Sequence, residues 1–371
     1  MSAERQTRLL IVASHILGGK SFSTQLVQAA RRIAGVNVEL VVLEGGDYHQ
    51  HRSQVSWFER RFSPLESSAV ARAKVGRVDR GRADVLVLQS FDLLPGCADV
   101  VGQVPTIVFH DSTNIASYEL ERDTSPRAFR SLRYALKRLV LDRFYRRAAS
   151  RVRCFLPRTR WCADSLKRHF FIPDERIIVC PAGLDLAQWT AREPPAKSQR
   201  PEVLFVGNDL ERKGVDILLQ CWQSGLADQA DLVVVSNDPQ AGRLQDLPGI
   251  KVLTGLRPGA QLREVFQRAT LFVFPTRKDH MGLVLTEAAA CGLPIIATDV
   301  GGVGEIARPG ENGILMSRRA GVADWRKAIE SMLDDPQRCE AMGRSSRALA
   351  ERHLSLAALE SRFRHALALT G

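Results

Sequence analysis

Two acidic residues, Asp279 and Glu287, lie eight positions apart in the second half of the chain. Asp279 follows an apolar run typical of a strand, and Glu287 lies inside the next helical segment. Between them, Met281, Gly282 and Leu283 mark the expected helix start. A helix start offers free backbone N–H groups and the positive end of a dipole, which suits a phosphate. Carboxylates beside it are suited to accept hydrogen bonds from sugar hydroxyls, so the stretch predicts a nucleotide-sugar pocket.

A lysine follows another strand pattern in a setting that suits a diphosphate. The apolar run 202–206 ends before Gly207 and Asn208, and Lys213 precedes the glycine at which the next helix is expected to begin. A lysine on a loop above a strand end is a compact positive charge for a diphosphate. The alternative is an ordinary solvated lysine, but the flanking glycines favour a functional role.

Two loops in the first half carry further candidates. Gly18 and Gly19 follow the first strand pattern, and paired glycines allow a close backbone approach to a ligand, although a plain turn is equally common. His110 ends another β-rich run, where it can hydrogen-bond a sugar hydroxyl or act as a buried cap. His15 and Asp111 are second-rank candidates beside them.

Short apolar runs alternate with helical patterns throughout, which is the signature of α/β layering with parallel sheets. In such sheets ligands bind at the carboxyl ends of the strands, where the residues above fall. The expected strands are 8–14, 36–43, 84–89, 105–109, 152–156, 176–180, 202–206, 231–236, 250–253, 269–274, 294–298 and 313–316. The expected helices are 23–33, 127–149, 213–222, 261–268, 283–291 and 322–333.

Two domains are the natural expectation for 371 residues. Residues 1–190 are expected to form an acceptor-binding domain and 202–353 a donor-binding domain. The proline-rich segment 191–201 reads as a linker. The amphipathic segment 354–371 is expected to form a last helix that can pack back on the first domain.

The net charge of +11 is unevenly distributed. Residues 1–185 carry 29 Lys and Arg against 19 Asp and Glu, a balance of +10, and the remainder carries 23 against 22, a balance of +1. A basic half favours an anionic partner, such as a phospholipid surface, nucleic acid or a phosphorylated acceptor, over solubility alone. Aromatic residues make up only 6% of the chain, which makes nucleic acid the least favoured of these partners.

The segment 127–153 carries ten Lys or Arg residues and one acid. Leu139 and Phe144 lie on its apolar face. The pattern fits a basic amphipathic helix on an anionic membrane, or a helix packed on the core with a solvated outer face. Trp57 and Phe58, flanked by arginines, are a second candidate membrane contact.

Cysteine usage and the N-terminus indicate the compartment. The seven cysteines are scattered singly, and the eight histidines show no metal-ligand spacing. We therefore expect neither disulfides nor a metal site. No apolar run approaches the roughly 18–20 residues that span a bilayer, and the N-terminus lacks a signal-peptide pattern. A cytoplasmic protein is expected, peripheral at the inner membrane face if the basic helix binds lipid.

The order and spacing of these motifs resemble the large family of retaining GT-B glycosyltransferases called family 4. The resemblance rests on Val203–Leu219, Pro275–Glu305 and Val179–Asp185, and it covers most of the chain, more closely over 176–317 than over 1–175. It implies two Rossmann-like parallel α/β domains facing a central cleft. It also implies a nucleotide-diphosphate sugar as co-substrate, no cofactor, and a reaction that retains anomeric configuration.

The resemblance also implies roles for single residues. Lys213 would contact the donor diphosphate, Glu287 would hold the ribose hydroxyls, and Asp279 would contact the transferred sugar. The backbone around Gly282 and Leu283 would lie against sugar and phosphate. The loop with the paired glycines would lie near the diphosphate and the acceptor, and the histidine at the strand end would contact the transferred sugar.

Two positions depart from the family pattern. Asp279 replaces a glutamate, which shortens the side chain by one methylene, and Asn208 replaces an arginine. Lys213 would then carry more of the diphosphate charge, together with Arg212 or with arginines on nearby loops. Either change can alter specificity or abolish activity.

The sequence thus predicts a metal-independent glycosyltransferase that moves a UDP- or GDP-linked sugar to a lipid-linked or cell-envelope acceptor at the cytoplasmic membrane face. One alternative is a glycosyltransferase with a small soluble acceptor. Another is a catalytically impaired GT-B scaffold, suggested by Asp279 and Asn208. A nucleic-acid-binding protein is the least favoured.

Overall fold

The computed structural model describes residues 6–14, 19–44, 83–124, 132–193, 200–256 and 259–371. The chain divides into two compact units, 1–183 with 356–371, and 184–355. The division falls at Leu184, earlier than the domain boundary expected at residue 190. The reason is that the following residues pack on the second unit: Leu184 N donates to Leu354 O at 2.7 Å, and the Trp189 ring meets the Phe266 ring edge-on at 5.7 Å.

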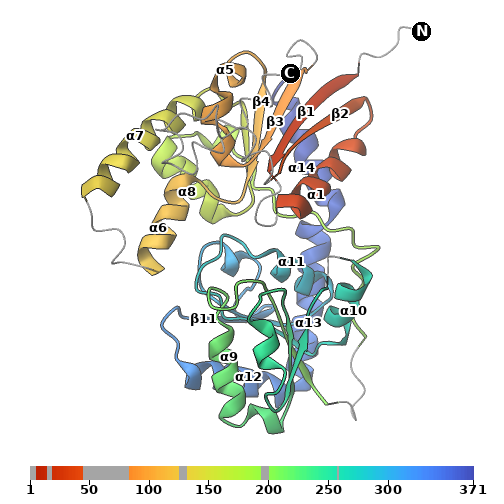
Figure 1. The fold of residues 1–371 in the computed structure, drawn as a ribbon. Coiled ribbons are helices and arrows are strands. Elements are labelled where there is room, and N and C mark those ends of the chain that lie inside the picture. The colour runs from red at the N-terminus through yellow and green to blue at the C-terminus, as the bar shows by residue number, and fades with distance from the viewer. Residues whose placement is uncertain (1–5, 15–18, 45–82, 125–131, 194–199, 257–258) are drawn as a thin grey trace. The chain divides into compact units, whose positions relative to one another are not determined.

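The first unit contains a five-stranded parallel sheet in the order β2-β1-β3-β4-β5 (Figure 1). The central strands β3 and β4 are buried along their whole length, as a sheet covered on both faces requires. The strands are β1 Thr7–Ser14, β2 Val36–Leu43, β3 Val85–Gln89, β4 Thr106–His110 and β5 Cys154–Pro157.

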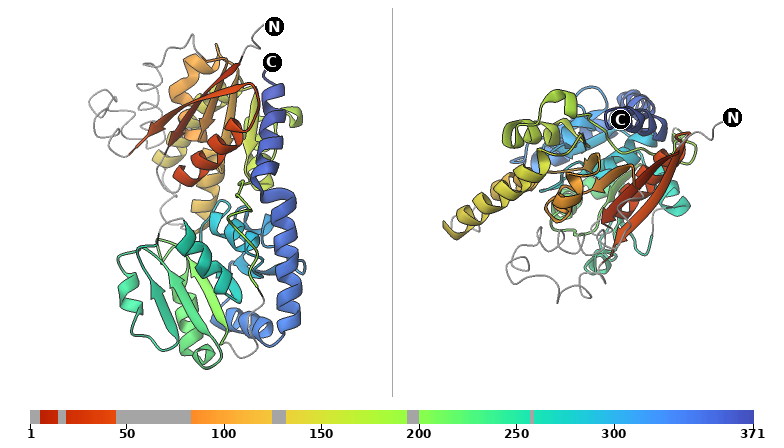
Figure 2. Two further views of the ribbon diagram at one scale, coloured as in Figure 1. Left: turned by 90° about the vertical axis from the view of Figure 1, so that its right-hand side faces the viewer. Right: turned by 90° about the horizontal axis from the view of Figure 1, so that it is seen from above.

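Helices cover both faces of this sheet. One face packs on α1 and on the C-terminal helix α14, which lie beside each other in Figure 2. Leu26 of α1 and Leu359 of α14 share that core with Phe109 of β4, while Tyr145 of α7 and Leu166 of α8 lie in the core of the other face. The helices are α1 Gly19–Arg31, α5 Ala98–Val101, α6 Asn114–Thr124, α7 Leu132–Ala149, α8 Arg160–Phe170 and α14 Leu356–Ala368.

The second unit contains a six-stranded parallel sheet in the order β11-β10-β9-β6-β7-β8, so the strand order reverses between β6 and β9. Apolar side chains of α9 and α12 pack on one face around Trp222 and Trp325. The strands are β6 Glu202–Val206, β7 Asp231–Val235, β8 Ile250–Leu253, β9 Leu271–Phe274, β10 Ile295–Thr298 and β11 Gly313–Met316. The helices are α9 Val215–Gln223, α10 Ala260–Arg268, α11 Leu283–Ala290, α12 Val322–Leu333 and α13 Pro336–Leu349.

One expected strand is absent: residues 176–180 form a single parallel bridge, between Phe155 and Ile177. Their amides do reach β5, since Ile178 N donates to Phe155 O at 2.9 Å and Cys180 N donates to Pro157 O at 2.7 Å. Pro157 has no N–H to donate back, so the ladder stops there. No helix among the described residues is long and apolar enough to cross a membrane.

Candidate functional site

The carboxyl ends of β6 and β9 bring two of the predicted loops together. β6 ends at Val206 and β9 at Phe274, and these neighbouring strands flank the point at which the strand order reverses. Ligands of open parallel sheets bind outside the strand ends at such a point. A backbone hydrogen bond from Arg277 N to Arg212 O, 2.9 Å long, joins the two loops.

Gly214 lets the loop after β6 lie against the end of β9. Its φ of 76° is left-handed, and a Cβ at this position would lie 2.1 Å from the carbonyl oxygen of Pro275. Only glycine satisfies both demands without displacing the backbone after β9. Because Lys213 is the preceding residue, this contact determines where the lysine side chain leaves the main chain.

Lys213 and Asp279 form an ion pair across the two loops, in which Nζ donates to Oδ2. Their side chains are only 13% and 14% exposed. The lysine Nζ also lies 4.7 Å from the centre of the Phe274 ring, within the range of a cation–π interaction. The two residues predicted to bind diphosphate and sugar therefore neutralise each other.

The start of α11 lies against the same aromatic ring. Gly282, with a φ of 72°, precedes the helix, and a Cβ there would lie 3.0 Å from Cε1 of Phe274. No side chain caps the first turn, so the helix presents amides and the positive end of its dipole. The Lys213 ammonium and the start of α11 thus both lie close to the Phe274 ring, and both favour an anion.

Glu287 lies one helical turn beyond Leu283 on the same face of α11. Its side chain keeps some exposed surface, but protein surrounds the carboxyl group and this burial raises its pKa to about 8. Among the described residues, no hydrogen bond or ion pair engages this carboxyl group. A ligand that donates hydrogen bonds to it would relieve an unfavourable environment.

Gly207 and Asn208 continue from β6 and hold the neighbouring strand. Gly207 N donates to Val235 O at 3.0 Å, and Asn208 Oδ1 accepts a hydrogen bond from the backbone N–H of Asn237 at 2.8 Å. The amide that replaces the arginine of the resembling family is therefore engaged in loop structure.

Arg212 is also engaged by the protein. Its Nε pairs with Asp209 at 2.6 Å, and its Nη1 donates to the carbonyl oxygen of Lys278 at 2.9 Å. These contacts occupy two of the five N–H donors of the guanidinium, so a share of Arg212 in the diphosphate charge stays a prediction. Met281 is 2% exposed and packs beneath the loop.

His110 is buried, with 3% of its surface exposed. Its ring packs among Phe91 and Phe155, with centroids 5.3 and 6.1 Å away, and its Nδ1 lies 3.1 Å from Ser112 O and 3.4 Å from Cys162 Sγ. Because a carbonyl only accepts, Nδ1 carries the proton. Burial lowers the pKa to about 4, partly opposed by the Ser112 carbonyl and Asp111.

The ring of His110 is enclosed by its own unit, and a contact of His110 with the transferred sugar stays a prediction. Its neutral Nε2 has no hydrogen-bond partner among the described residues, but protein atoms cover it. Of the other candidates in this unit, Asp111 is partly exposed after β4, and Gly19 is the first residue of α1. His15, Gly18 and the aromatic pair at 57–58 lie outside the described residues.

Sequence reasoning did not single out Arg158, the first residue after β5. It is 2% exposed and lies at the same edge of the sheet as His110, whose carbonyl oxygen accepts from Arg158 N at 2.9 Å. Its position in the sequence could have indicated a functional role, because Arg158 is a cation directly after a parallel strand and just before Thr159, which caps α8.

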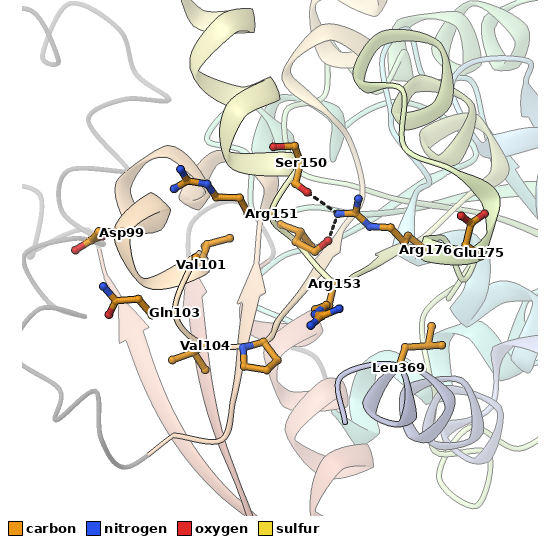
Figure 3. Close-up of a pocket in the computed structure, with 13 residues that line it drawn as sticks. Asp99, Val101, Gln103, Val104, Ser150, Arg151, Arg153, Glu175, Arg176 and Leu369 are labelled. Atoms are coloured by element: carbon orange, nitrogen blue, oxygen red, sulfur yellow. Dashed lines mark hydrogen bonds between the residues drawn. The ribbon is translucent and has the colours of Figure 1, made fainter.

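Figure 3 shows a pocket of about 1110 Å³ at the opposite edge of the first unit's sheet. Val104 and Pro105 line it just before β4, and Arg153 lies just before β5. Arg176 is fixed at its rim, because its guanidinium donates to carbonyls that end α7 and to that of Val152. Among the predicted donor and acceptor residues that the structure describes, none lines this pocket.

Comparison with solved structures defines the class of the fold. Sucrose-phosphate synthase from Thermosynechococcus elongatus is similar with a TM-score of 0.73, 18% identity and 98% of each chain covered. An Anabaena protein, HepE, solved in complex with UDP, is similar with a TM-score of 0.71 and 16% identity, over 98% of this chain and all of that one. The protein thus has the GT-B fold, which confirms the prediction of two parallel α/β domains.

Sequence comparison relates the second unit to a family of enzymes within this fold. Residues 200–335 match the model of the family described as Glycosyl transferases group 1. D-inositol 3-phosphate glycosyltransferase of Rhodococcus opacus is 32% identical over 202 residues, 48% of this chain and 45% of that protein. Alpha-maltose-1-phosphate synthase of Mycolicibacterium smegmatis is 28% identical over 211 residues, 50% and 54% of the two chains. The matched parts thus span about half the length of these curated relatives.

Proposed function

We propose that this protein is a glycosyltransferase that takes a sugar from a nucleotide-diphosphate sugar. The observation that carries this proposal is the Lys213–Asp279 ion pair at the β6–β9 edge, beside the start of α11 and the Glu287 carboxyl group. The family of residues 200–335 supports it. The UDP and UDP-glucose complexes of the similar Anabaena protein favour a UDP-linked donor, with a GDP-linked donor as the second choice.

Donor binding would exchange the internal ion pair for ligand contacts. The diphosphate would take the place of Asp279 beside the Lys213 ammonium, and the amides at the start of α11 would share its charge. The released Asp279 carboxylate would accept hydrogen bonds from the transferred sugar, and Glu287 from the ribose. Lys213 and the helix start would then stabilise the charge that develops on the leaving diphosphate.

The family resemblance supports retention of anomeric configuration, with the acceptor bound by the first unit. The alternative is a catalytically impaired scaffold. An engaged Asn208 and a shorter Asp279 would then leave the nucleotide bound weakly or not at all.

A thermal-shift screen of UDP-, GDP- and ADP-sugars tests donor binding. A ligand that binds only the native state raises its stability by about 2.7 kcal/mol at a concentration of 100 Kd, so the true donor class should raise Tm by several degrees. Sugar release or transfer measured with the same ligand separates an enzyme from an impaired scaffold. If none of the nucleotides changes Tm at millimolar concentration, the second unit does not bind a nucleotide donor.

The end of α7 offers support for a membrane-bound acceptor. Leu139 and Phe144 of α7 and Phe171 after α8 are 69%, 54% and 75% exposed. We call these three residues the α7 patch. α7 packs on the core through Tyr145 and Ala148, as the alternative of a core-packed helix predicts, but Leu139 and Phe144 are not part of that packed face.

Exposed arginines of α7 accompany the α7 patch. The Arg146 guanidinium lies 5.6 Å from the centre of the Phe171 ring, and Arg143 and Arg147 are exposed on the same helix. Exposed large apolar side chains among arginines are typical of a surface that binds anionic membranes. We therefore propose a lipid-linked or cell-envelope acceptor at the membrane, with a small soluble acceptor as the alternative.

Replacing both Leu139 and Phe144 by serine is expected to weaken binding to phosphatidylglycerol vesicles by about tenfold or more, because each large apolar side chain contributes about 1.5–3 kcal/mol when buried. Co-sedimentation at two salt concentrations measures the change. Leu40→Ser is the matched control, since Leu40 is also exposed (38%) but lies on β2. Equal sedimentation of the double variant and the wild type would remove the support for a membrane site.

A further inference from the structure

The guanidinium group of Arg158 is buried without a hydrogen-bond partner. The residue is 2% exposed, and none of Nε, Nη1 and Nη2 has a partner among the residues that the structure describes. An arginine presents five N–H donors, and leaving charged donors unpaired in the interior costs several kcal/mol. Such a side chain is not explained by the stability of the unliganded fold.

Aromatic rings offset only part of this cost. The Cζ atom of Arg158 lies 3.4 Å from the centre of the Phe22 ring and 5.2 Å from that of Phe109. A desolvated cation–π contact contributes about 2 kcal/mol, but it leaves the in-plane N–H groups unsatisfied. Burial lowers the pKa of Arg158 to about 9, so the group remains a cation at neutral pH.

The nearest acid does not complete the site. Asp111 attracts Arg158 electrostatically, but it forms no hydrogen bond with the guanidinium. The donors of a guanidinium form a planar fork that matches two oxygens of a phosphate. An oxyanion is therefore the ligand that this side chain lacks.

The position of Arg158 also suits a ligand. It follows β5 at the carboxyl edge of a parallel sheet, where such sheets bind ligands. The eleven-residue helix α8 begins two residues later, and the positive end of its dipole adds to the attraction for an anion. Side chains alternate between the two faces of a strand, so Arg158 lies on the same face of the sheet as Cys154 and Leu156. Helix α1 covers this face, and its partly exposed residue Phe22 lies over the guanidinium.

We propose that Arg158 binds a phosphate group of a substrate, in a site that Phe22 covers when it is empty. This rests on the proposed function, because the phosphate would belong either to a phosphorylated acceptor on the first unit or to the donor diphosphate. The ring of Phe22 would turn aside to admit the ligand, and the fork of N–H groups would hold two of its oxygens. Transfer of sugar would then be selective for phosphate-bearing substrates.

Thermal unfolding of Arg158→Met, with and without inorganic phosphate, tests the site. Without phosphate the variant is expected to unfold at a higher temperature than the wild type, because an apolar side chain of similar length replaces an unpaired buried cation. The variant should need about 10-fold to 100-fold more phosphate for a given rise in Tm, because it has lost a charge-assisted hydrogen bond to the phosphate. Arg158→Lys, which keeps the charge without the fork, should lose most of the response as well.

The Kd for UDP, measured for the wild type and for Arg158→Met, distinguishes the acceptor from the donor as the source of the phosphate. If the acceptor supplies it, Arg158→Met leaves the Kd for UDP unchanged and loses the response to inorganic phosphate and to hexose phosphates. If the donor supplies it, the Kd for UDP rises by about the same factor. Arg160→Met, which removes an exposed neighbouring cation, controls for nonspecific charge effects.

A lower Tm for Arg158→Met together with an unchanged phosphate response would overturn the proposal and make Arg158 a structural residue. Failure of the proposed function is a separate result. Lys213→Met should weaken donor binding by about 100-fold while leaving the Arg158-dependent part of the phosphate response intact.

Discussion

Replacing Lys213 by methionine is expected to lower the rate of glycosyl transfer by about 100-fold or more, since removal of one group that stabilises transition-state charge costs roughly 2.7–4 kcal/mol. Lys213 is placed for this role at the β6–β9 edge, with its ammonium 4.7 Å from the Phe274 ring that also borders the start of α11. A radiolabelled-sugar transfer assay or donor hydrolysis measures the effect.

The same substitution has a second consequence that must be separated from the first. Removing the lysine leaves Asp279, 14% exposed, without its ion-pair partner. Breaking a buried pair from one side costs about 3 kcal/mol, so Lys213→Met alone should also lower Tm. The double variant Lys213→Met with Asp279→Asn removes the unpaired charge and is expected to recover most of the stability and none of the activity.

A matched control exists in the same unit. Lys251 on β8 also forms ion pairs, with Glu202 and Asp231, but it lies on the strand at the far end of the sheet order from the predicted loops. Lys251→Met should leave turnover unchanged. Full turnover by the folded double variant would show that the Lys213 ammonium has no part in the reaction.

Donor affinity is expected to rise with pH, by about tenfold per pH unit up to about pH 8. Burial holds the pKa of Glu287 at about 8 in the free protein, so the carboxyl group is mostly protonated at pH 7. Accepting two hydrogen bonds from a ribose requires the carboxylate, so donor binding must release a proton below this pKa. Calorimetric titration with a nucleotide sugar at pH 6, 7, 8 and 9, in two buffers, measures affinity and proton release together.

Glu287→Gln should abolish this pH dependence and bind the donor weakly at every pH. Glu264→Gln, on the exposed face of α10, should retain it. Stability provides an independent check. Because the folded-state pKa of Glu287 is raised, its contribution favours the native state at low pH and is lost as pH rises towards 8, and the glutamine variant should lose less stability over that range. A wild-type affinity that does not change between pH 6 and 8 would remove Glu287 from the ribose site.

The strands were more predictable from the sequence than the helices. The expected bounds 36–43, 202–206, 250–253 and 313–316 coincide with β2, β6, β8 and β11, because short runs rich in branched side chains end at clear turn residues. Four helices were not predicted: α5, α6, α8 and α13. α8 and α13 do begin with local signals, since Thr159 and Asp335 accept hydrogen bonds from amides in the first turn and Pro336 follows the second cap.

The candidate site shows where local patterns stop being informative. The sequence indicated Lys213, Asp279 and Glu287 as ligand contacts, but not that the first two neutralise each other across 66 positions. That pair results from the adjacency of β6 and β9, which no local pattern encodes. The burial of Arg158 beneath Phe22 and the enclosure of His110 by Phe91 and Phe155 likewise depend on distant parts of the chain.

The most direct test is a titration of the wild type and of the Lys213→Met/Asp279→Asn variant with the nucleotide sugar that gives the largest thermal shift. Saturable one-to-one binding by the wild type is expected, with affinity reduced by about 100-fold in the folded double variant, as loss of a charge-assisted contact to a diphosphate requires. Equal affinity of the two proteins would contradict a donor site at the β6–β9 edge.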